Sequence, residues 1–241
     1  MTPFFLQFFV SFVTLISNQT KGWCMEMKKN KELWLGIGFI AVFILWTLLI
    51  MSIDVQSIGP NGSSVGFATL NGFFHQSTGV HMSLYVITDW LGLVPIAIAF
   101  GFAVLGLVQW IQRRKIVKVD GSILALGGFY VVVIAVYVFF EYVVINYRPT
   151  LIDGYLEASY PSSTTMLVTC IIPTSMMEFC KRIKQNSLRR IVLIFCALFT
   201  AFMVVGRLLS GVHWLTDIIG GVWISIGLVL TYHYIVKRIT N

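Results

Sequence analysis

Charged residues are scarce in this chain: they make up 11% of its 241 residues, against roughly 25% in an average soluble domain. Hydrophobic residues account for 57%, and the mean hydropathy is +0.85. This leaves too little polar surface to cover a soluble core of the size that the chain would form. The composition excludes a soluble globular domain and indicates an integral membrane protein.

Cysteine is also rare, and neither a repeat nor a low-complexity tract is present. The four cysteines are Cys24, Cys170, Cys180 and Cys196. Their spacing is typical neither of a disulfide framework nor of a metal site. We therefore expect no metal and no cofactor.

Six apolar runs are near the length of about 20 residues that crosses the hydrocarbon of a bilayer. They cover residues 33–51, 84–110, 123–145, 164–179, 191–205 and 218–236. Pro95 lies in the second run, where we expect a kink. The sequence thus predicts an all-α membrane protein with six transmembrane helices in a bundle.

Basic residues concentrate in alternate connections between these runs. Of the 17 lysines and arginines, 15 precede the first run, separate the second from the third or the fourth from the fifth, or follow the sixth. Because such residues accumulate in cytoplasmic loops, we expect both termini in the cytoplasm and residues 146–163 and 206–217 outside. The net charge of +7 then reflects topology and contact with anionic lipid, and gives no indication of nucleic acid.

The first residues need a separate interpretation. Residues 4–16 form an apolar run that is short for a span and has no basic residue before it. A cleaved signal peptide is one alternative, but its charged front end is missing. We favour translation from Met25 or Met27, because "MKKNKELW" is typical of the start of a bacterial membrane protein. Residues 1–26 would then lie outside the native protein, residues 27–241 would form one membrane domain, and the location would be a bacterial plasma membrane.

Two basic residues, Arg148 and Arg207, fall on the predicted outer side. Arg207 belongs to the stretch "GRLLSGVHWLTDIIGG", which also holds His213 and Asp217. Two guanidinium groups can clamp the oxygens of a phosphate. His213 and Asp217 are four residues apart, so on a helix the carboxylate could hold one ring nitrogen and leave the other free to attack phosphorus.

A third outer segment, "YPSSTT", adds a place for an anion. Ser162, Ser163 and Thr164 open a predicted helix directly after Pro161. Free backbone N–H groups and the helix dipole favour an anion there. Phosphate clamp, helix N-terminus and oriented histidine together indicate a phosphoryl-transfer site.

These motifs resemble the type 2 phosphatidic acid phosphatase superfamily, integral membrane lipid phosphatases with six helices. Its pattern has a lysine seven residues before Arg-Pro, then Pro-Ser-Gly-His, then Ser-Arg with histidine six residues later and aspartate four beyond. The matching positions here are Arg148-Pro149, Pro161-Ser162, Arg207, His213 and Asp217. The resemblance covers about residues 130–236. It implies that His213 forms a phosphohistidine.

Four positions depart from the family pattern. Glu141 stands where the family has lysine, Ser163 and Thr164 replace glycine and histidine, and Gly206 replaces serine. In the family the missing histidine protonates the leaving oxygen, a role that threonine cannot fill at neutral pH. The resemblance therefore implies a nucleophile and a clamp without a general acid, whose contribution is typically 10²–10⁴-fold. His75 and His81, in a predicted outer loop, are candidates to replace it.

Two function classes remain open. The first is a phosphatase that acts on a lipid phosphate or a polyprenyl pyrophosphate, such as undecaprenyl pyrophosphate, at the outer leaflet. The second is a catalytically impaired relative that binds a phosphorylated lipid or a partner protein. His213 and Asp217 favour the enzyme, whereas Glu141 and Thr164 favour the relative. A transporter is a weaker third alternative, because no inverted repeat is present.

Overall fold

A computed structural model describes residues 30–240 of the chain. The proposed N-terminal extension, residues 1–26, lies outside the described residues. The described part is helical, and its β-type contacts are isolated bridges in the connecting loops. Its α-helices are α2 (Lys31–Ser52), α3 (Ala68–Thr78), α4 (Met82–Leu91), α5 (Leu93–Arg113), α6 (Gly121–Tyr142), α7 (Ser163–Arg182), α8 (Asn186–Leu209) and α9 (Leu215–Thr240).

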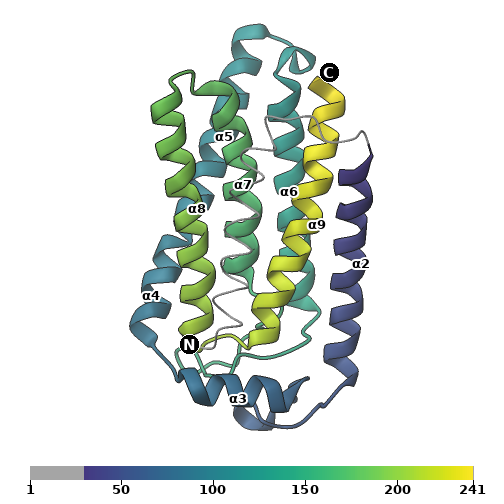
Figure 1. The fold of residues 1–241 in the computed structure, drawn as a ribbon, viewed down its shortest axis with the longest axis vertical. Helices are drawn as coiled ribbons and strands as arrows, with labels where there is room; N and C mark the ends of the chain where they lie inside the picture. Colours follow the sequence, from purple (N-terminus) through teal and green to yellow (C-terminus); the bar gives the residue numbers. More distant parts are fainter. Residues whose placement is uncertain (1–29, 241) are drawn as a thin grey trace.

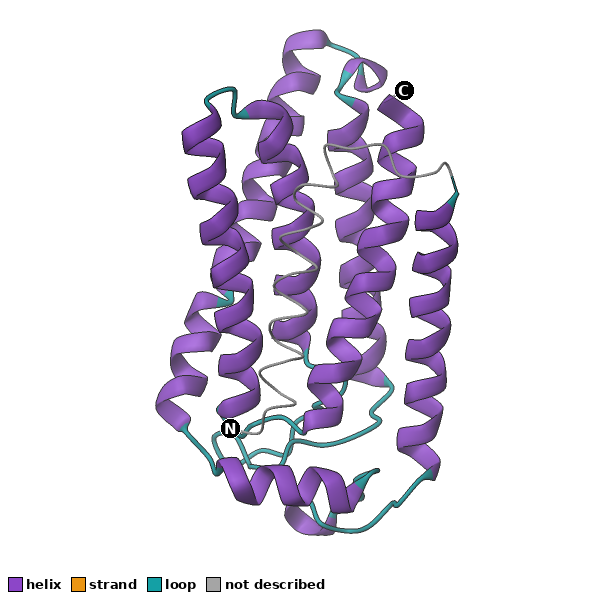
Figure 2. Ribbon diagram, viewed as in Figure 1, coloured by secondary structure: helices purple, strands orange, loops and turns teal. Residues whose placement is uncertain are grey.

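The long helices form a bundle and run alternately up and down along its long axis (Figure 1). α3 lies across the lower end, almost perpendicular to the others, and the teal loops of Figure 2 gather beside it. A helix in the first predicted outer loop was not expected from the sequence. Within the described residues, α3 closes this end of the bundle.

Within residues 30–240, five segments are long and apolar enough to cross a membrane, which makes this a multi-pass membrane protein. They are Lys31–Ser52, Met82–Arg113, Gly121–Tyr142, Asn186–Leu209 and Leu215–Ile239. α7 is the remaining long helix of the bundle and packs against α5, α6, α8 and α9. Because its neighbours cover it, α7 can carry threonines, serines and Glu178 that a lipid-facing helix would avoid.

The second predicted span is interrupted, but not at Pro95 itself. α4 ends at Leu91 and α5 begins at Leu93, with Gly92 between them. Proline has no N–H to donate to the carbonyl four residues earlier, and its ring crowds that carbonyl. For Pro95 that carbonyl belongs to Leu91. The proline therefore breaks the helix one turn before its own position, and α4 becomes free to lean toward α8 (Figure 1).

The connections that carry most of the basic residues all lie at the upper end in Figure 1. Residues 114–120 and 183–185 form the turns there, next to the start of α2 and the end of α9. The long loop 143–162 and the short loop 210–214 lie at the opposite end, where Arg148 and His213 are found. The predicted separation of the two sets of loops is thus present in the fold. The assignment of the upper end to the cytoplasm stays a prediction from the charges.

Buried polar contacts fix the lower loops to the bundle. Tyr160 is buried, and its hydroxyl lies 2.8 Å from Oγ1 of Thr47 on α2. A Cβ on Gly220 of α9 would lie 2.5 Å from the Tyr160 ring, so only glycine permits this close packing. Asn71 of α3 donates from Nδ2 to Oγ1 of Thr216, 3.0 Å away, at the start of α9. These contacts attach α3 and the loop before α7 to α2 and α9, next to the candidate site.

Candidate phosphate-binding site

Three segments that are far apart in the sequence meet at the lower end of the bundle. Arg148 lies in the loop after α6, Ser162 directly precedes α7, and Arg207 belongs to the last turn of α8. His213 lies in the loop before α9, and Asp217 in the first turn of that helix. All five residues are buried. These five of the residues singled out in the sequence therefore lie at the same end of the bundle.

His213 is held by both of its ring nitrogens. Nδ1 lies 3.2 Å from the carbonyl oxygen of Ser159, and Nε2 lies 3.3 Å from Nη2 of Arg207. A carbonyl can only accept and a guanidinium can only donate, so Nδ1 carries the proton and Nε2 keeps its lone pair. The lone pair of His213 thus faces an arginine that could also hold an anion.

Asp217 does not hold the histidine ring in the way that the spacing suggested. Its Oδ2 lies 3.8 Å from Nδ1 of His213, which is too long for a hydrogen bond. The carboxylate instead accepts from the backbone N–H of Trp214, with N and Oδ2 2.9 Å apart, and from Nδ2 of Asn146, 3.3 Å from Oδ1. His213 precedes α9, so the two residues are not one helical turn apart. An acidic side chain that reaches back from the third helical residue closes the N-terminus in the manner of a capping box. Asp217 thereby fixes the loop that carries His213.

Each of the two arginines already has a carboxylate partner. Arg148 Nε lies 3.0 Å from Oε2 of Glu157, without the geometry of a hydrogen bond, and Arg207 Nη1 lies 3.4 Å from Oδ1 of Asp89. Both guanidinium groups also stand over the ring of Tyr85, at 5.9 Å for Arg148 and 5.0 Å for Arg207. The shared aromatic ring places the two positive groups on one side of the site.

Several buried donors at the site have no hydrogen-bond partner. They include Nη1 of Arg148, Nε of Arg207 and the hydroxyl of Ser162. Buried polar groups are normally satisfied, and a charged donor left alone costs more than a neutral one. An oxyanion bound at the two guanidinium groups would give such donors an acceptor.

The three residues at the start of α7 make different contributions to this site. Ser162 donates its backbone N–H to the carbonyl of Asp217, 3.1 Å away, which joins α7 to α9. Ser163 lines a small pocket together with His213 and Ser159. Thr164 is turned toward the junction of α4 and α5, and its Cγ2 would lie 3.5 Å from a Cβ on Gly92.

The structure shows what surrounds two of the residues that depart from the family pattern. Glu141 lines the same small pocket as His213, but among the described residues it forms no ion pair with either arginine. The arginines are instead paired with other carboxylates. At Gly206, a Cβ would lie 2.7 Å from Cγ2 of Thr88 on α4. The close packing of α4 against α8 explains why this chain has glycine at that position.

Burial and nearby positive charges favour the neutral form of His213. Burial lowers the pKa of His213 well below its usual range, and the positive charges of Arg148 and Arg207 lower it further. The hydrogen bond to the Ser159 carbonyl acts in the opposite direction but is the smaller effect. A neutral imidazole with an available lone pair is the form that can attack an electrophile.

The two other histidines of the lower end do not enter the site. His75 on α3 packs its ring against Trp214, with ring centroids 5.4 Å apart, and burial lowers its pKa. His81 is exposed, and its Nε2 lies 2.9 Å from the carbonyl oxygen of Thr78. Within residues 30–240, no group of three His, Cys, Asp or Glu side chains is placed to hold a metal ion.

Sequence reasoning missed the residues that surround the clamp. Tyr85, Asp89, Asn146, Glu157 and Ser159 belong to none of the motifs. The acidic pair carried a weak signal, because Asp89 interrupts an apolar run and Glu157 follows Arg148 in the same loop. The other three side chains are typical of any polar loop or helix end, so only the fold reveals their role.

Comparison with known proteins found a matching family model and a similar solved structure. Residues 139–241 match the model of the PAP2 superfamily, which confirms the resemblance carried by the motifs. No curated protein sequence matches the chain. A transmembrane PAP2-type phosphatidylglycerolphosphate phosphatase from Bacillus subtilis is similar in structure, with 18% sequence identity and a TM-score of 0.47. The similarity covers 84% of this chain and 94% of that one.

Proposed function

We propose that this chain is a membrane lipid phosphatase of the PAP2 superfamily, whose model matches residues 139–241. Its substrate is a lipid phosphate or a polyprenyl pyrophosphate. The observation that carries the proposal is the set of buried, unpartnered guanidinium donors of Arg148 and Arg207 beside the neutral His213. Fixed donors of this kind stabilise an oxyanion most effectively where water is excluded.

The same proposal includes the topology. α7 crosses the membrane as a sixth span, because its polar side chains are covered by neighbouring helices. The end with the basic loops faces the cytoplasm of a bacterial cell, and the site faces outward. Lipid substrates would reach the site from the outer leaflet.

In the proposed mechanism, Arg148 and Arg207 hold the non-bridging oxygens of the phosphate. Nε2 of His213 leaves its contact with Arg207 and forms a bond to phosphorus, while the bond to the leaving oxygen breaks and that oxygen keeps the electron pair. Nδ1–H stays on the carbonyl of Ser159 and orients the ring. Water then attacks the phosphohistidine and releases inorganic phosphate, which regenerates the imidazole.

The leaving group decides which substrates this site favours. Thr164 cannot protonate a leaving oxygen, so the oxygen departs as an anion. An alkoxide from a simple lipid phosphate is a poor leaving group, whereas the inner phosphate of a pyrophosphate is stable as an anion. We therefore propose a preference for a polyprenyl pyrophosphate over a lipid monophosphate.

The test is phosphate release by the purified full-length protein from a panel of lipid phosphates and polyprenyl pyrophosphates. His213→Ala should abolish release and remove an acid-labile phosphoenzyme, while the matched control His81→Ala should retain both. Activity that survives His213→Ala unchanged would refute the mechanism.

A second candidate function rests on a specific observation. Both clamp arginines are paired with carboxylates, and Glu141 lines the pocket beside His213. This negative charge favours a relative that binds a phosphorylated lipid or a partner protein without turnover. Lipid binding that is lost in Arg148→Ala and Arg207→Ala, with no phosphate release from any substrate, would support this second function.

A further inference from the structure

A second cavity lies far from His213, in the half of the bundle that carries the basic loops. It has a volume of about 420 Å³ and is located between α5, α6 and the turn that joins them. Phe102, Gly106 and Trp110 of α5 line one wall, and Leu126, Gly127 and Gly128 of α6 line the other. The lining is apolar or aromatic. This feature, the α5–α6 groove, does not depend on the proposed function.

The groove exists because the glycines of α6 that line it have no side chain to fill it. A Cβ added to Gly127 or Gly128 would meet no atom within 4 Å. Phe102 and Leu126 are buried and form its floor, whereas Trp110 and Ile116 are exposed at its edge. Both helices belong to candidate membrane spans, so the groove opens toward lipid.

Three positive charges stand at the end of this groove without a carboxylate partner among the described residues. Arg114, Lys115 and Lys118 belong to the turn between the two helices, and none of their side chains forms an ion pair or a hydrogen bond within the described residues. Lys115 and Lys118 directly flank Ile116 and Val119, which line the groove. An apolar channel and uncommitted cations are therefore adjacent.

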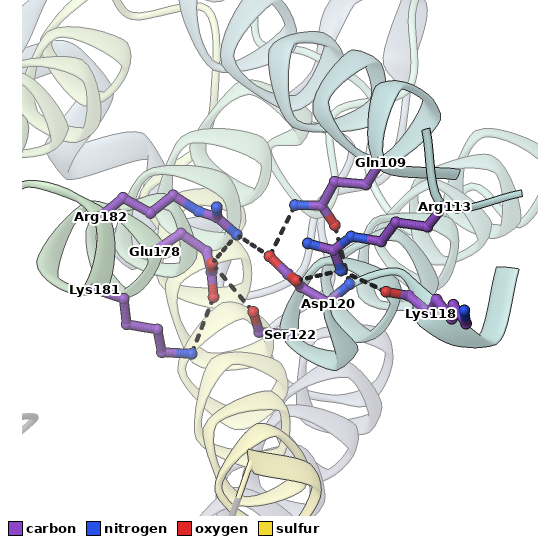
Figure 3. A network of polar contacts seen from close by, with 8 residues as sticks. All are labelled: Gln109, Arg113, Lys118, Asp120, Ser122, Glu178, Lys181 and Arg182. Carbon is purple, nitrogen blue, oxygen red and sulfur yellow. Dashed lines mark hydrogen bonds and ion pairs between the residues drawn. The ribbon is translucent and has the colours of Figure 1, made fainter. Parts of the chain in front are cut away.

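The turn that carries these charges is held in place by a polar network (Figure 3). Asp120 accepts from Nε2 of Gln109 at 2.8 Å, Nη1 of Arg113 at 2.8 Å and Nη2 of Arg182 at 3.3 Å. Nη2 of Arg182 also lies 3.3 Å from Oε2 of Glu178 on α7. Arg113 and Arg182 are thus committed to carboxylates, and they fix the turn against α7. The remaining cations stand in a defined position.

We propose that the α5–α6 groove binds one acyl chain of an anionic phospholipid whose phosphate lies on Arg114, Lys115 and Lys118. The groove supplies apolar contact along the chain, and the cations supply attraction for a negative headgroup at the depth where headgroups lie. A second copy of this chain would place the same cations against its own basic turn, which charge repulsion disfavours. Charge complementarity therefore selects the anionic lipid as the occupant.

The experiment uses the purified full-length protein in lipid nanodiscs, with phosphatidylglycerol titrated into phosphatidylcholine. Lipid binding is read by native mass spectrometry and by the shift in Tm. We expect phosphatidylglycerol to remain bound and to raise Tm, and soluble glycerol phosphate to have no effect, because the acyl chain is required. An equal shift with both lipids, or an equal shift with glycerol phosphate, would overturn the proposal.

Two variants test the two halves of the site separately. Lys115→Gln/Lys118→Gln should weaken phosphatidylglycerol binding by about thirtyfold, from about 1 kcal/mol for each of the two charges near the headgroups. The control Arg189→Gln/Arg190→Gln removes two cations from the same end of the bundle, away from the groove. Equal losses in both variants would show only general attraction to an anionic surface and would overturn the proposal.

Gly128→Leu should fill the groove and reduce binding, while Gly38→Leu on α2 is the matched control, because a Cβ at Gly38 also meets nothing within 4 Å. Gly127→Leu is the second variant if Gly128→Leu does not fold. Binding that persists in a folded groove variant would refute the acyl-chain site. A dimer that disappears with Gly128→Leu would identify a second copy as the occupant and refute the lipid.

Discussion

Nη2 of Arg207 lies 3.3 Å from Nε2 of His213, so the proposed nucleophilic nitrogen and a proposed phosphate ligand are each other's partners. Nη2 of Arg207 now donates to the lone pair of His213. A phosphate oxygen that binds Arg207 would accept from this N–H instead. Binding of the phosphate would then also free the nucleophile. This relationship couples the two halves of the candidate site, and both are buried.

The lowered pKa of His213 predicts activity that persists in mild acid. Because the folded-state pKa lies below the ordinary value of about 6.5, the imidazole stays neutral as the pH falls through that value. The acid limb of kcat/KM assigned to His213 should therefore lie below pH 6.5. Substrates whose phosphate groups have different pKa values should show the acid limb of kcat/KM at the same pH. If the pH of the acid limb changes with the substrate, the titrating group is the phosphate of the substrate and not His213.

The same shift has a consequence for stability. In the unfolded chain His213 takes up a proton near its ordinary pKa of about 6.5, but the folded protein does not until a lower pH. The contribution of His213 to stability should therefore be fully present above a pH of about 6.5 and be lost as the pH falls from there toward the folded pKa. His213→Gln should show a smaller loss of Tm between neutral and mildly acidic pH than the unchanged protein.

Asp217→Asn should affect both stability and rate, because Asp217 caps α9 rather than holding the His213 ring directly. The single amide oxygen can replace only one of the two carboxylate oxygens, so either the Trp214 N–H or Nδ2 of Asn146 loses its acceptor, and we expect a loss of about 1 kcal/mol. The loop that carries His213 should loosen, and turnover should fall. Thermal unfolding and phosphate release measure the two effects. Unchanged stability would contradict the capping role.

Asp89→Asn should strengthen phosphate binding. Asp89 pairs with Arg207, but its side chain is 57% exposed, so the pair is screened by solvent and contributes less than a buried one. Release of Arg207 should tighten binding of inorganic phosphate or substrate by about two- to fivefold. Inhibition by inorganic phosphate measures this change. Weaker binding would show that Asp89 positions the arginine rather than competes for it.

Thr164→His restores the residue that the family has at this position. If expulsion of the leaving group limits the reaction, the new acid should raise turnover of a lipid monophosphate more than that of a pyrophosphate, by up to the 10²–10⁴-fold typical of acid catalysis. Both substrates should be measured with both proteins. Equal gains on the two substrates would show that the leaving group is not limiting.

The topology is open to a direct labelling test. In a cysteine-depleted background, Asp153→Cys should react with a membrane-impermeant thiol reagent in intact cells, and Gln185→Cys should react only after lysis. The loops that carry these positions lie at opposite ends of the bundle. Labelling of position 185 but not of 153 from outside would reverse the orientation and place the candidate site in the cytoplasm.

The sequence by itself determined the class of fold and the residues of the motifs. Apolar runs separated by basic turns leave few arrangements other than a helical membrane bundle, because backbone polar groups in lipid must pair within helices. The spacing of Arg207, His213 and Asp217 was readable because the chemistry of phosphate binding requires those residue types. The start of α8 shows the limit of this interpretation: the helix begins at Asn186, five residues before the predicted 191, because Arg189 and Arg190 lie inside it.

The tertiary structure alone decided which partner each of these residues has. Periodicity could not show that Asp217 bonds to Trp214 and Asn146, that Ser159 holds the ring of His213, or that α3 lies across the end of the bundle. The pairing of Arg207 with Asp89 and the closeness of Gly206 to Thr88 both follow from the way α4 leans on α8 after the break at Gly92. Such contacts depend on the packing of helices that are distant in sequence. Local patterns specify helices and turns, whereas distances between them are set only when all the side chains pack together.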